Sequence, residues 1–398
     1  MNNLCVLPFN SISVTSDGKL RPCCNTHNYS YSTKIQDVDL EGILNNSDAI
    51  SLRQSFIENK KDSRCDRCWK IESLSNKSFR HVANESVDRG LHTIDTSNLR
   101  SKISYDDIRY LDITLGNKCN LACRMCNPWS SSLYAKQVKD LKIYDGAVNI
   151  DFDEKTRNKL LDVIKKSPNL SSIYMLGGEP LVNDFHDEIV DLLISTNRSK
   201  NIILHYSTNL QIDVEKYLEL WENFHIIELS ISIDGSGDTY EYIRWPGSWD
   251  KLYRNLKKVV DYKNQQTRNL LYPSIATTAQ NLNAHNLPDL IHTIKDLDKD
   301  MTFYFIPVTG GYYLEMTPHV VLNEAIEKLS VMEDATGRIA ELINYYKSAL
   351  TKTVDKESIK RFFEQQKNFD RYRKQNLFQT LPHFKEYADS FNISTWNE

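Results

Sequence analysis

The sequence predicts an α/β fold organised as a partial (βα)6, TIM-like barrel, with a cysteine-rich segment before it and a helical segment after it. Between residues 106 and 317, short apolar runs rich in β-formers alternate with amphipathic helical patterns. This alternation is typical of parallel strands joined by helical crossovers. A chain of 398 residues is also long enough to hold such a barrel together with appended elements.

Six runs carry the strand pattern, and helical runs separate them. The strands are expected at residues 108–115, 170–176, 201–208, 226–234, 274–280 and 301–308. The helices are expected at residues 130–143, 154–166, 185–196, 214–223, 249–263 and 287–298. In parallel sheets of this kind, reactive groups gather in the loops that follow the strands. The unusual motifs of the barrel segment lie in such loops.

The rest of the chain falls into three blocks. Residues 1–75 hold five cysteines in turn-rich sequence, and predict a hairpin followed by a short helix near residues 48–58. Residues 76–105 are polar and are expected to form a linker. Residues 318–398 carry helical patterns rich in Lys, Phe and Tyr, and are expected to pack against the barrel or to cover its mouth.

The composition is that of an ordinary globular protein, with 40% hydrophobic residues, 26% charged residues and a net charge of −4. This balance disfavours a nucleic-acid partner, because phosphate affinity draws on many Lys and Arg side chains. No apolar run reaches the roughly 18 residues that span a bilayer. The N-terminus lacks the basic-then-apolar layout of a secretion signal. We therefore expect a cytoplasmic protein without a membrane partner.

The eight cysteines are unevenly placed along the chain. They lie at Cys5, Cys23, Cys24, Cys65, Cys68, Cys119, Cys123 and Cys126. The cytoplasm keeps thiols reduced, so structural disulfides are a poor explanation for them. Clustering of this kind indicates ligands of a metal ion or of an inorganic cluster.

The segment CNLACRMC places the thiolates of Cys119, Cys123 and Cys126 in one loop after the first barrel strand. A zinc site would need a fourth protein ligand to complete its tetrahedron, and no His or Cys follows nearby. A four-iron cluster needs one ligand for each iron, so three cysteines leave one iron open to a small chelating molecule. The spacing therefore favours an iron–sulfur cluster over zinc.

This C-x3-C-x2-C loop after a first strand resembles that of the radical S-adenosylmethionine (SAM) superfamily, over residues 106 to about 310. The resemblance implies that Cys119, Cys123 and Cys126 hold a 4Fe-4S cluster whose open iron is chelated by SAM. It also implies that one electron cleaves SAM to a 5′-deoxyadenosyl radical, which abstracts hydrogen from a substrate. Met125 stands where the family usually has an aromatic residue near adenine, and its apolar, polarisable side chain could fill that place.

The second strand ends in the turn Gly177, Gly178, Glu179 and Pro180. Glycines let a backbone approach a ligand closely, and a carboxylate accepts hydrogen bonds from an ammonium group. On turn chemistry alone, this sequence would be an ordinary turn. Its position is similar to that of the GGEP motif of the radical SAM family. The resemblance implies that the turn belongs to the cofactor site and that Gly178 and Glu179 hold the SAM amino group.

Polar residues also end the third and fourth strands, namely Ser207, Thr208, Asn209, Ser232 and Asp234. Ser232 and Asp234 share one face through the two-residue period of a strand. Hydroxyl and carboxylate groups suit a ribose or carboxylate partner, but such side chains can also cap the next helix. The family resemblance implies ribose binding for Ser232 and Asp234. Cofactor contact is expected for Ser207 and Asn209, with capping left open for Asn209.

Arg244, in the segment YEYIRWPGSW, resembles an arginine that meets the SAM carboxylate in peptide-modifying members of the family. From the residues alone, a surface ion pair with Glu241 explains this side chain equally well. The sequence therefore leaves two partners open for Arg244.

The N-terminal block presents a second group of thiolates. Gly18 permits a tight hairpin whose arms bring Cys5 and Cys23 together, and the CDRC loop supplies Cys65 and Cys68. Four thiolates in separated pairs are a common structural zinc site. The residues alone therefore favour zinc here.

The spacing C-x12-G-x4-C followed by CxxC resembles the SPASM or twitch module, which binds an auxiliary 4Fe-4S cluster beside radical SAM barrels. The resemblance implies iron at this second site, in a single-cluster, twitch-like module that accepts or relays an electron. Here the module precedes the barrel, whereas in the family it follows the barrel. Cys24 directly follows Cys23, which leaves open which of the two is the ligand.

The resemblance as a whole implies a radical SAM enzyme with one auxiliary cluster, and family analogy favours one that modifies a peptide or protein side chain. Related enzymes also dehydrogenate small molecules, and that alternative stays open. An electron donor such as flavodoxin or ferredoxin is implied as a partner. A non-catalytic iron–sulfur or zinc protein would need neither the GGEP turn nor an open iron. RNA modification is disfavoured by the near-neutral charge.

Overall fold

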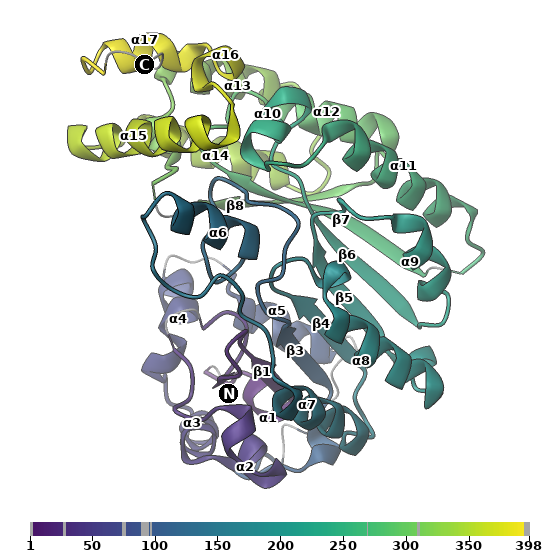
Figure 1. Cartoon of the computed structure of the whole chain (residues 1–398). Coiled ribbons are helices and arrows are strands. Elements are labelled where there is room, and N and C mark those ends of the chain that lie inside the picture. Colours follow the sequence, from purple (N-terminus) through teal and green to yellow (C-terminus); the bar gives the residue numbers. More distant parts are fainter. Residues whose placement is uncertain are drawn as a thin grey trace. The chain divides into compact units, whose positions relative to one another are not determined.

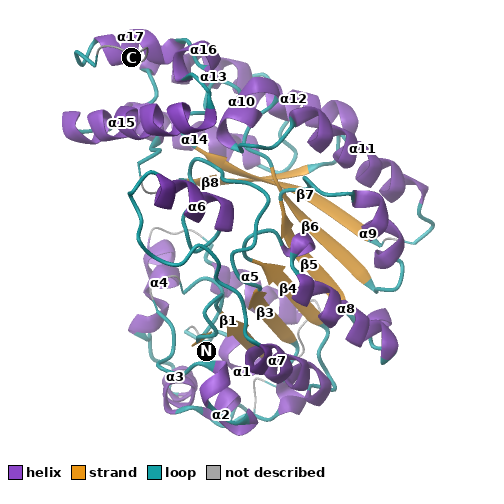
Figure 2. Ribbon diagram, viewed as in Figure 1, coloured by secondary structure: helices purple, strands orange, loops and turns teal. Residues whose placement is uncertain are grey.

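The computed structural model describes residues 3–26, 29–73, 77–88, 95, 98–268, 270–308 and 311–393 (Figure 1). The strands in these residues are β1 (Ser11–Val14), β2 (Leu20–Arg21), β3 (Tyr110–Thr114), β4 (Ser172–Leu176), β5 (Ile203–Thr208), β6 (Ile226–Ser232), β7 (Leu271–Ala279) and β8 (Thr302–Pro307). The α-helices are α1 (Leu7–Asn10), α2 (Leu40–Asn45), α3 (Ser47–Ile57), α4 (Asp66–Ser73), α5 (Phe79–Asp88), α6 (Ser132–Asp140), α7 (Glu154–Lys166), α8 (Asp184–Ser195), α9 (Val214–Trp221), α10 (Gly237–Ile243), α11 (Trp249–Gln265), α12 (Leu287–Leu297), α13 (His319–Ser330), α14 (Arg338–Leu350), α15 (Lys356–Arg373), α16 (Leu377–Thr380) and α17 (His383–Asp389). From β3 onward strands and helices alternate, giving the expected α/β class (Figure 2).

The chain divides into two compact units. The first unit comprises Met1–Lys118, Asn149–Ser207 and Trp221–Glu228. The second unit comprises Cys119–Val148, Thr208–Leu220 and Leu229–Glu398. The N-terminal cysteines therefore belong to the first unit, and the three-cysteine loop belongs to the second.

In the first unit the strand order is β2-β1-β3-β4-β5. β1 and β2 form an antiparallel hairpin, and β1 runs parallel to β3 with Ser13 opposite Asp112. The parallel sheet continues through β4 and β5, with Asp112 opposite Tyr174 and Tyr174 opposite His205. The N-terminal hairpin is thus part of the same sheet as the first strands of the barrel.

One face of these strands is apolar and covered by helix. Leu111 and Ile113 on β3 are completely buried, and the same alternation continues on β4 and β5. α8 lies on this face, because its His186 Nε2 is 2.9 Å from the hydroxyl of Tyr206, which is buried on β5. Burial of this apolar layer is the main source of stability for such a sheet.

In the second unit β7 runs parallel to β8, with Ser274 opposite Thr302 and Ala279 opposite Pro307. The C-terminal helices build a core that includes Phe362, Phe363 and Phe384. Met125 of the cysteine loop packs against this core. Within this unit the C-terminal segment therefore packs onto the loop that carries the cysteines.

Each of the six expected barrel strands is present, although β7 begins at Leu271 rather than Ser274. Helix α10 is not predicted by the sequence, and neither is the pairing of β1 with β3, since pairing across a long separation leaves no local pattern. The expected linker at 76–105 contains α5, and its residues 76, 89–94 and 96–97 lie outside the described residues. No described helix combines the length and apolar character that crossing a bilayer requires.

Two histidines of the second unit are expected to make its stability depend on pH. The ring centroids of His285 and His383 are 4.8 Å apart. Burial, with His383 nearby, lowers the pKa of His285 to about 3, and burial lowers the pKa of His383 to about 4. Histidines in an unfolded chain titrate near pH 6.5, so the unfolded state binds protons first as the pH falls. The free energy of unfolding should therefore decline as the pH falls from about 6.5 to about 3.

Urea unfolding at about pH 7 and about pH 5 measures this decline. The variant His383→Asn should show a smaller decline than the wild type, because one of the two depressed pKa values is removed. His292→Asn is the matched control, since the His292 side chain is 74% exposed. An identical decline in His383→Asn and in the wild type would show that these histidines do not control the pH dependence.

Candidate active site

The cysteine loop follows β3 and is held in place by the segment after α10. The Ala122 N–H donates to the Trp245 carbonyl at 2.7 Å, and the Arg124 N–H donates to the Ile243 carbonyl at 2.8 Å. Both bonds belong to the second unit, so the fold of that unit fixes the loop backbone. The three thiols consequently have defined positions.

Of the three loop cysteines, Cys123 is buried, and Cys119 and Cys126 are half-buried. Burial and the nearby Cys123 thiol raise the pKa of Cys126 to about 12. Burial also raises the pKa of Cys123, and Arg244 partly opposes that rise. The Cys126 N–H also donates to the Cys123 carbonyl at 3.0 Å, so the backbones of these two cysteines lie close together, as suits ligands of one centre. Because iron binds thiolates, assembly of a cluster here has to release these protons.

Arg244 joins the cysteine loop to the end of β6. Its Nη1 lies 3.7 Å from Cys123 Sγ, and its Nη2 lies 2.7 Å from the carboxylate of Asp234. Asp234 is fully buried, and its other oxygen accepts a hydrogen bond from the Thr278 N–H at 2.7 Å. Burial raises the pKa of Asp234, and the guanidinium of Arg244 opposes that rise. The guanidinium of Arg244 therefore lies between the carboxylate of Asp234 and the thiol of Cys123.

This ion pair excludes one of the two partners that the sequence leaves open for Arg244. In the described part of the chain Arg244 pairs with Asp234, whereas Glu241 accepts a hydrogen bond from the Trp249 N–H at 2.9 Å. The alternative of a surface pair with Glu241 is therefore wrong. Among the described residues the buried Arg244 Nε has no hydrogen-bond partner, so one N–H of the guanidinium remains for a ligand.

Asn209 also reaches the cysteine loop. Its Nδ2 lies 2.8 Å from Asn120 Oδ1 and 3.9 Å from Cys119 Sγ. Its Oδ1 accepts a hydrogen bond from the Gln211 N–H at 2.8 Å. Because α9 begins only at Val214, Asn209 does not cap that helix, and the capping alternative is wrong.

The Gly-Gly-Glu-Pro turn lies in the first unit at the end of β4. Gly177 and Gly178 have φ angles of 90° and 52°, which other residues adopt only with strain. A Cβ on Gly178 would lie 2.1 Å from the Lys118 carbonyl oxygen, and the N–H of the fully buried Glu179 donates to this oxygen at 2.9 Å. The turn is therefore packed against the residue that precedes Cys119 in the chain.

The other expected cofactor residues take more ordinary places. Pro180 begins a short 3-10 helix, Pro180–Val182. Ser207 lies near the end of β5, with its Oγ 3.1 Å from the Tyr174 hydroxyl. Ser232 is the half-buried last residue of β6. These contacts do not test cofactor binding, so the roles of the three residues stay predictions.

Two buried arginines, absent from the sequence-based candidates, tie the cysteine loop to α15. The completely buried Arg124 donates to Gln366 at 2.8 Å and pairs with Asp370 at 2.5 Å. Arg373 donates to the Ala122 carbonyl at 2.6 Å, and burial with Arg124 nearby lowers its pKa to about 9. The partners of Arg124 lie 242 and 246 residues further along the chain, so no local pattern could have pointed to them.

Two fully buried amides follow β7. Gln280 and Asn281 are 0% exposed, and within the described residues no atom of their side-chain amides has a hydrogen-bond partner. An unpaired buried amide costs about 1–3 kcal/mol, and a native structure usually pairs it with water or a ligand. Because Thr278, whose N–H binds Asp234, lies two residues before Gln280, the amides lie at the same end of β7 as the Arg244 site. Sequence reasoning missed both residues, since a polar pair after a strand resembles any turn.

The N-terminal cysteines converge within the first unit. Cys5, Cys23, Cys65 and Cys68 line one cavity. Burial raises the pKa of Cys5 well above its usual value, and the other three thiols each raise it further. Arg64, Arg67 and Arg80 line the same cavity, and their positive charge suits an anionic cluster with thiolate ligands. Residue type, convergence and charge therefore fit an iron–sulfur cluster.

Cys24 points elsewhere. Burial and the nearby carboxylate of Asp112 raise the pKa of its thiol, and Cys24 is not among the residues that line the cavity in the described structure. Of the adjacent pair, Cys23 is therefore the residue that faces the other thiols.

Among the described residues, no group of three or more His, Cys, Asp or Glu side chains is arranged to hold a metal ion. In a four-iron cluster each thiolate binds a different iron, so the sulfurs stand further apart than around one ion. The cavity between the four N-terminal thiols is compatible with this wider spacing.

Two protein-family models match the chain. Residues 113–273 match the Radical SAM superfamily, and residues 5–69 match SPASM, an iron-sulfur cluster-binding domain. The middle of the chain therefore carries a radical SAM domain, and its N-terminal part carries an iron–sulfur cluster-binding domain. Its radical SAM domain implies a 4Fe-4S cluster and SAM, and its SPASM domain implies an auxiliary iron–sulfur cluster. The resemblance read from the cysteine spacing is confirmed.

The chain is 26% identical over 227 residues to a Methanocaldococcus jannaschii protein described as a probable GTP 3′,8-cyclase, covering 56% of this chain and 67% of the relative. A GTP 3′,8-cyclase from Clostridium perfringens is also 26% identical over 227 residues, covering 56% of this chain and 63% of the relative. Among solved structures, Streptococcus suis SuiB bound to S-adenosylmethionine is 15% identical, with a TM-score of 0.37 over 95% of this chain and 75% of that one. The chain spans about two thirds of the length of the GTP cyclases it matches.

Proposed function

We propose that this radical SAM enzyme reductively cleaves SAM and uses the resulting 5′-deoxyadenosyl radical to abstract hydrogen from a peptide or protein side chain. The observation that carries the cleavage step is the fixed loop of Cys119, Cys123 and Cys126, with Arg244 beside it. Three thiolate ligands leave one iron of a four-iron cluster open. A cluster held by these three cysteines would supply the electron for cleavage.

We expect side chains of this protein to bind SAM next to the cluster. Arg244, kept in orientation by Asp234, is proposed to donate hydrogen bonds to the SAM carboxylate. Asn209 lies beside Cys119 and is a further candidate contact. The turn Gly177–Pro180 keeps its expected role, with the buried carboxylate of Glu179 accepting hydrogen bonds from the SAM ammonium group. Ser232 and Ser207 keep their expected cofactor roles as part of the proposal.

We place the auxiliary 4Fe-4S cluster on Cys5, Cys23, Cys65 and Cys68, where it would relay an electron. Reduction of the clusters needs a donor such as flavodoxin or ferredoxin. A reducing compartment such as the cytoplasm suits a chain whose eight cysteines are all free thiols.

The preference for a peptide substrate draws on Arg244, which resembles an arginine of peptide-modifying members and lies beside Cys123. A second candidate is radical chemistry on a small molecule, and the 26% identity to GTP 3′,8-cyclases favours it. Product analysis separates the two, because a modified peptide gains or loses mass on its own chain.

The cysteine assignment predicts a selective loss of iron. After anaerobic reconstitution the wild type should hold about eight irons per chain, and the Cys65→Ala/Cys68→Ala variant about four. This variant should still release 5′-deoxyadenosine from SAM with dithionite, because the three-cysteine loop is intact. Iron and sulfide assays together with nucleoside chromatography measure both quantities.

The matched control is Cys24→Ala, which removes a neighbouring half-buried thiol that does not line the cavity. It should keep about eight irons. Zinc in place of iron, or loss of the second cluster in Cys24→Ala alone, would contradict the assignment.

A further inference from the structure

The sheet of the first unit has a second face, opposite the one on which α8 lies, and this face is polar. By the two-residue alternation of strands it carries Asp112 on β3, Tyr174 on β4 and His205 on β5. Parallel strands that are covered on both faces read as nearly continuous apolar runs. These strands instead alternate, which indicates that the second face serves a ligand rather than a core.

Five side chains form a row across this face, here called the polar lane: Ser13, Asp112, Tyr174, His205 and Glu228. Strand register places the first four opposite one another in this order. The row ends where His205 Nδ1 lies 3.4 Å from the carboxylate of Glu228. From Asp112 to Glu228 the lane crosses three strand spacings, or about 14 Å.

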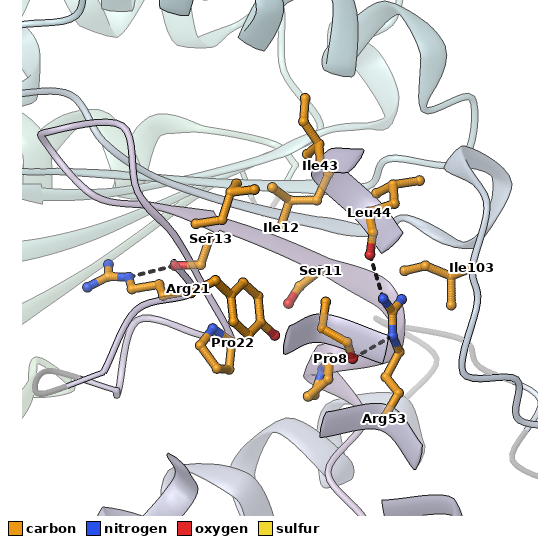
Figure 3. Close-up of a pocket in the computed structure, with 13 residues that line it drawn as sticks. Pro8, Ser11, Ile12, Ser13, Arg21, Pro22, Ile43, Leu44, Arg53 and Ile103 are labelled. Atoms are coloured by element: carbon orange, nitrogen blue, oxygen red, sulfur yellow. Dashed lines mark hydrogen bonds between the residues drawn. The ribbon is translucent and has the colours of Figure 1, made fainter. Parts of the chain in front are cut away.

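The buried end of the lane is centred on Asp112, which is 0% exposed. Its Oδ2 accepts a hydrogen bond from the Ser13 hydroxyl at 2.9 Å, and Arg21 Nη2 lies 3.6 Å from its Oδ1. Among the described residues, nothing donates a hydrogen bond to this Oδ1. The Arg21 Nε donates to the Ser13 hydroxyl at 2.8 Å, and both residues also line a small cavity (Figure 3). A buried carboxylate oxygen without a donor is costly unless a ligand supplies one.

The open end of the lane combines aromatic rings with an unbalanced charge. The rings of Tyr174 and His205 stack with their centroids 4.2 Å apart. Burial lowers the pKa of His205 to about 4, so the ring is neutral near pH 7 and does not balance Glu228. In the described part of the chain no Lys or Arg lies within 4 Å of the Glu228 carboxylate, whose side chain is 47% exposed.

We propose that the polar lane binds a positively charged group of the substrate, an ammonium or a guanidinium, between Asp112 and Glu228. Arg21 offsets the charge of Asp112, so the lane keeps one net negative charge, which attracts a cation and repels an anion. The aromatic rings add cation–π attraction. About 14 Å accommodates an extended Lys or Arg side chain together with part of its peptide backbone. The inference rests on the proposed function, because it names the substrate class of that enzyme. It points to a basic peptide rather than to a nucleotide.

The test uses the reconstituted holoenzyme and defined probes. These are acetyl-Gly-Lys-Gly amide, the same peptide with Gln or Glu in place of Lys, and GTP, each measured by calorimetry or ligand-observed NMR. The Lys peptide should bind at least about tenfold more tightly than the other probes. Asp112→Asn and Glu228→Gln should each weaken Lys-peptide binding about tenfold or more. Asp162→Asn, which changes an exposed carboxylate on α7, should leave it unchanged.

Equal binding of the Lys and Gln peptides, tighter binding of the Glu peptide or GTP, or full binding by Glu228→Gln would overturn the inference. Glu228→Gln carries the test even if Asp112→Asn does not fold, because Glu228 is about half exposed. Reductive release of 5′-deoxyadenosine without any peptide is measured on the same samples. If the wild type released no 5′-deoxyadenosine, the proposed function would be overturned. If it released 5′-deoxyadenosine but did not bind the Lys peptide selectively, only the proposed role of the polar lane would be overturned.

Discussion

Replacing Cys119, Cys123 and Cys126 together by Ala should abolish the release of 5′-deoxyadenosine from SAM under reducing conditions. The loop then has no thiolate with which to hold a cluster, so no iron is presented to SAM. Iron should fall from about eight to about four per chain, because the N-terminal cysteines are untouched. Nucleoside chromatography and iron assays on the anaerobically reconstituted protein give both values.

The Cys65→Ala/Cys68→Ala variant is the matched comparison for this experiment. It should show the opposite pattern, with the same loss of iron but with nucleoside release retained. Nucleoside release by the triple variant at the wild-type rate would mean that SAM is cleaved at another site.

Replacing Arg124 by Met should lower the free energy of unfolding by about 3–5 kcal/mol, the usual cost of removing one member of a buried ion pair. The variant leaves the carboxylate of Asp370 buried without its cation, and it also removes the hydrogen bond to Gln366. Because Arg124 lies between Cys123 and Met125, the same change should loosen the cysteine loop and reduce its retention of iron. Urea unfolding and iron retention after gel filtration measure the two effects.

Two further variants separate the ion pair from a general loss of charge. Arg338→Met removes a half-exposed arginine paired with Glu341 on α14, and should change stability by no more than about 0.5 kcal/mol. Arg124→Met/Asp370→Leu should recover part of the loss, since it leaves no buried charge unpaired. If Arg124→Met were as stable as Arg338→Met, the loop would not depend on its anchor to α15.

Local patterns were sufficient for the barrel elements and for the cysteine loop. Each expected strand has a short apolar run between turn-forming residues, and such patterns depend only on neighbours in the sequence. The three loop cysteines lie within eight residues of each other, so their spacing alone indicates that they bind an iron–sulfur cluster. Gly178 was recognisable for a similar reason, because it belongs to a four-residue Gly-Gly-Glu-Pro motif. Its positive φ and its close contact with Lys118 explain why this position requires glycine.

Features that depend on distant partners could not be predicted in this way. From the sequence alone Arg124 would be taken for an exposed cation, because its partner Asp370 lies on the distant helix α15. Asp112 reads as one polar residue in a strand, and only the register with Ser13 and Tyr174 reveals the polar lane. The choice between Cys23 and Cys24 likewise needed the fold, because adjacent residues are distinguished by the direction of their side chains.

The central claim is that a cluster held by three cysteines presents an open iron to SAM, and electron paramagnetic resonance of the reduced Cys65→Ala/Cys68→Ala variant tests it most directly. This variant should hold only the cluster of the three-cysteine loop. Addition of SAM should change the signal of that cluster, because the cofactor becomes a ligand of one iron. A signal that stays the same at saturating SAM would contradict the claim.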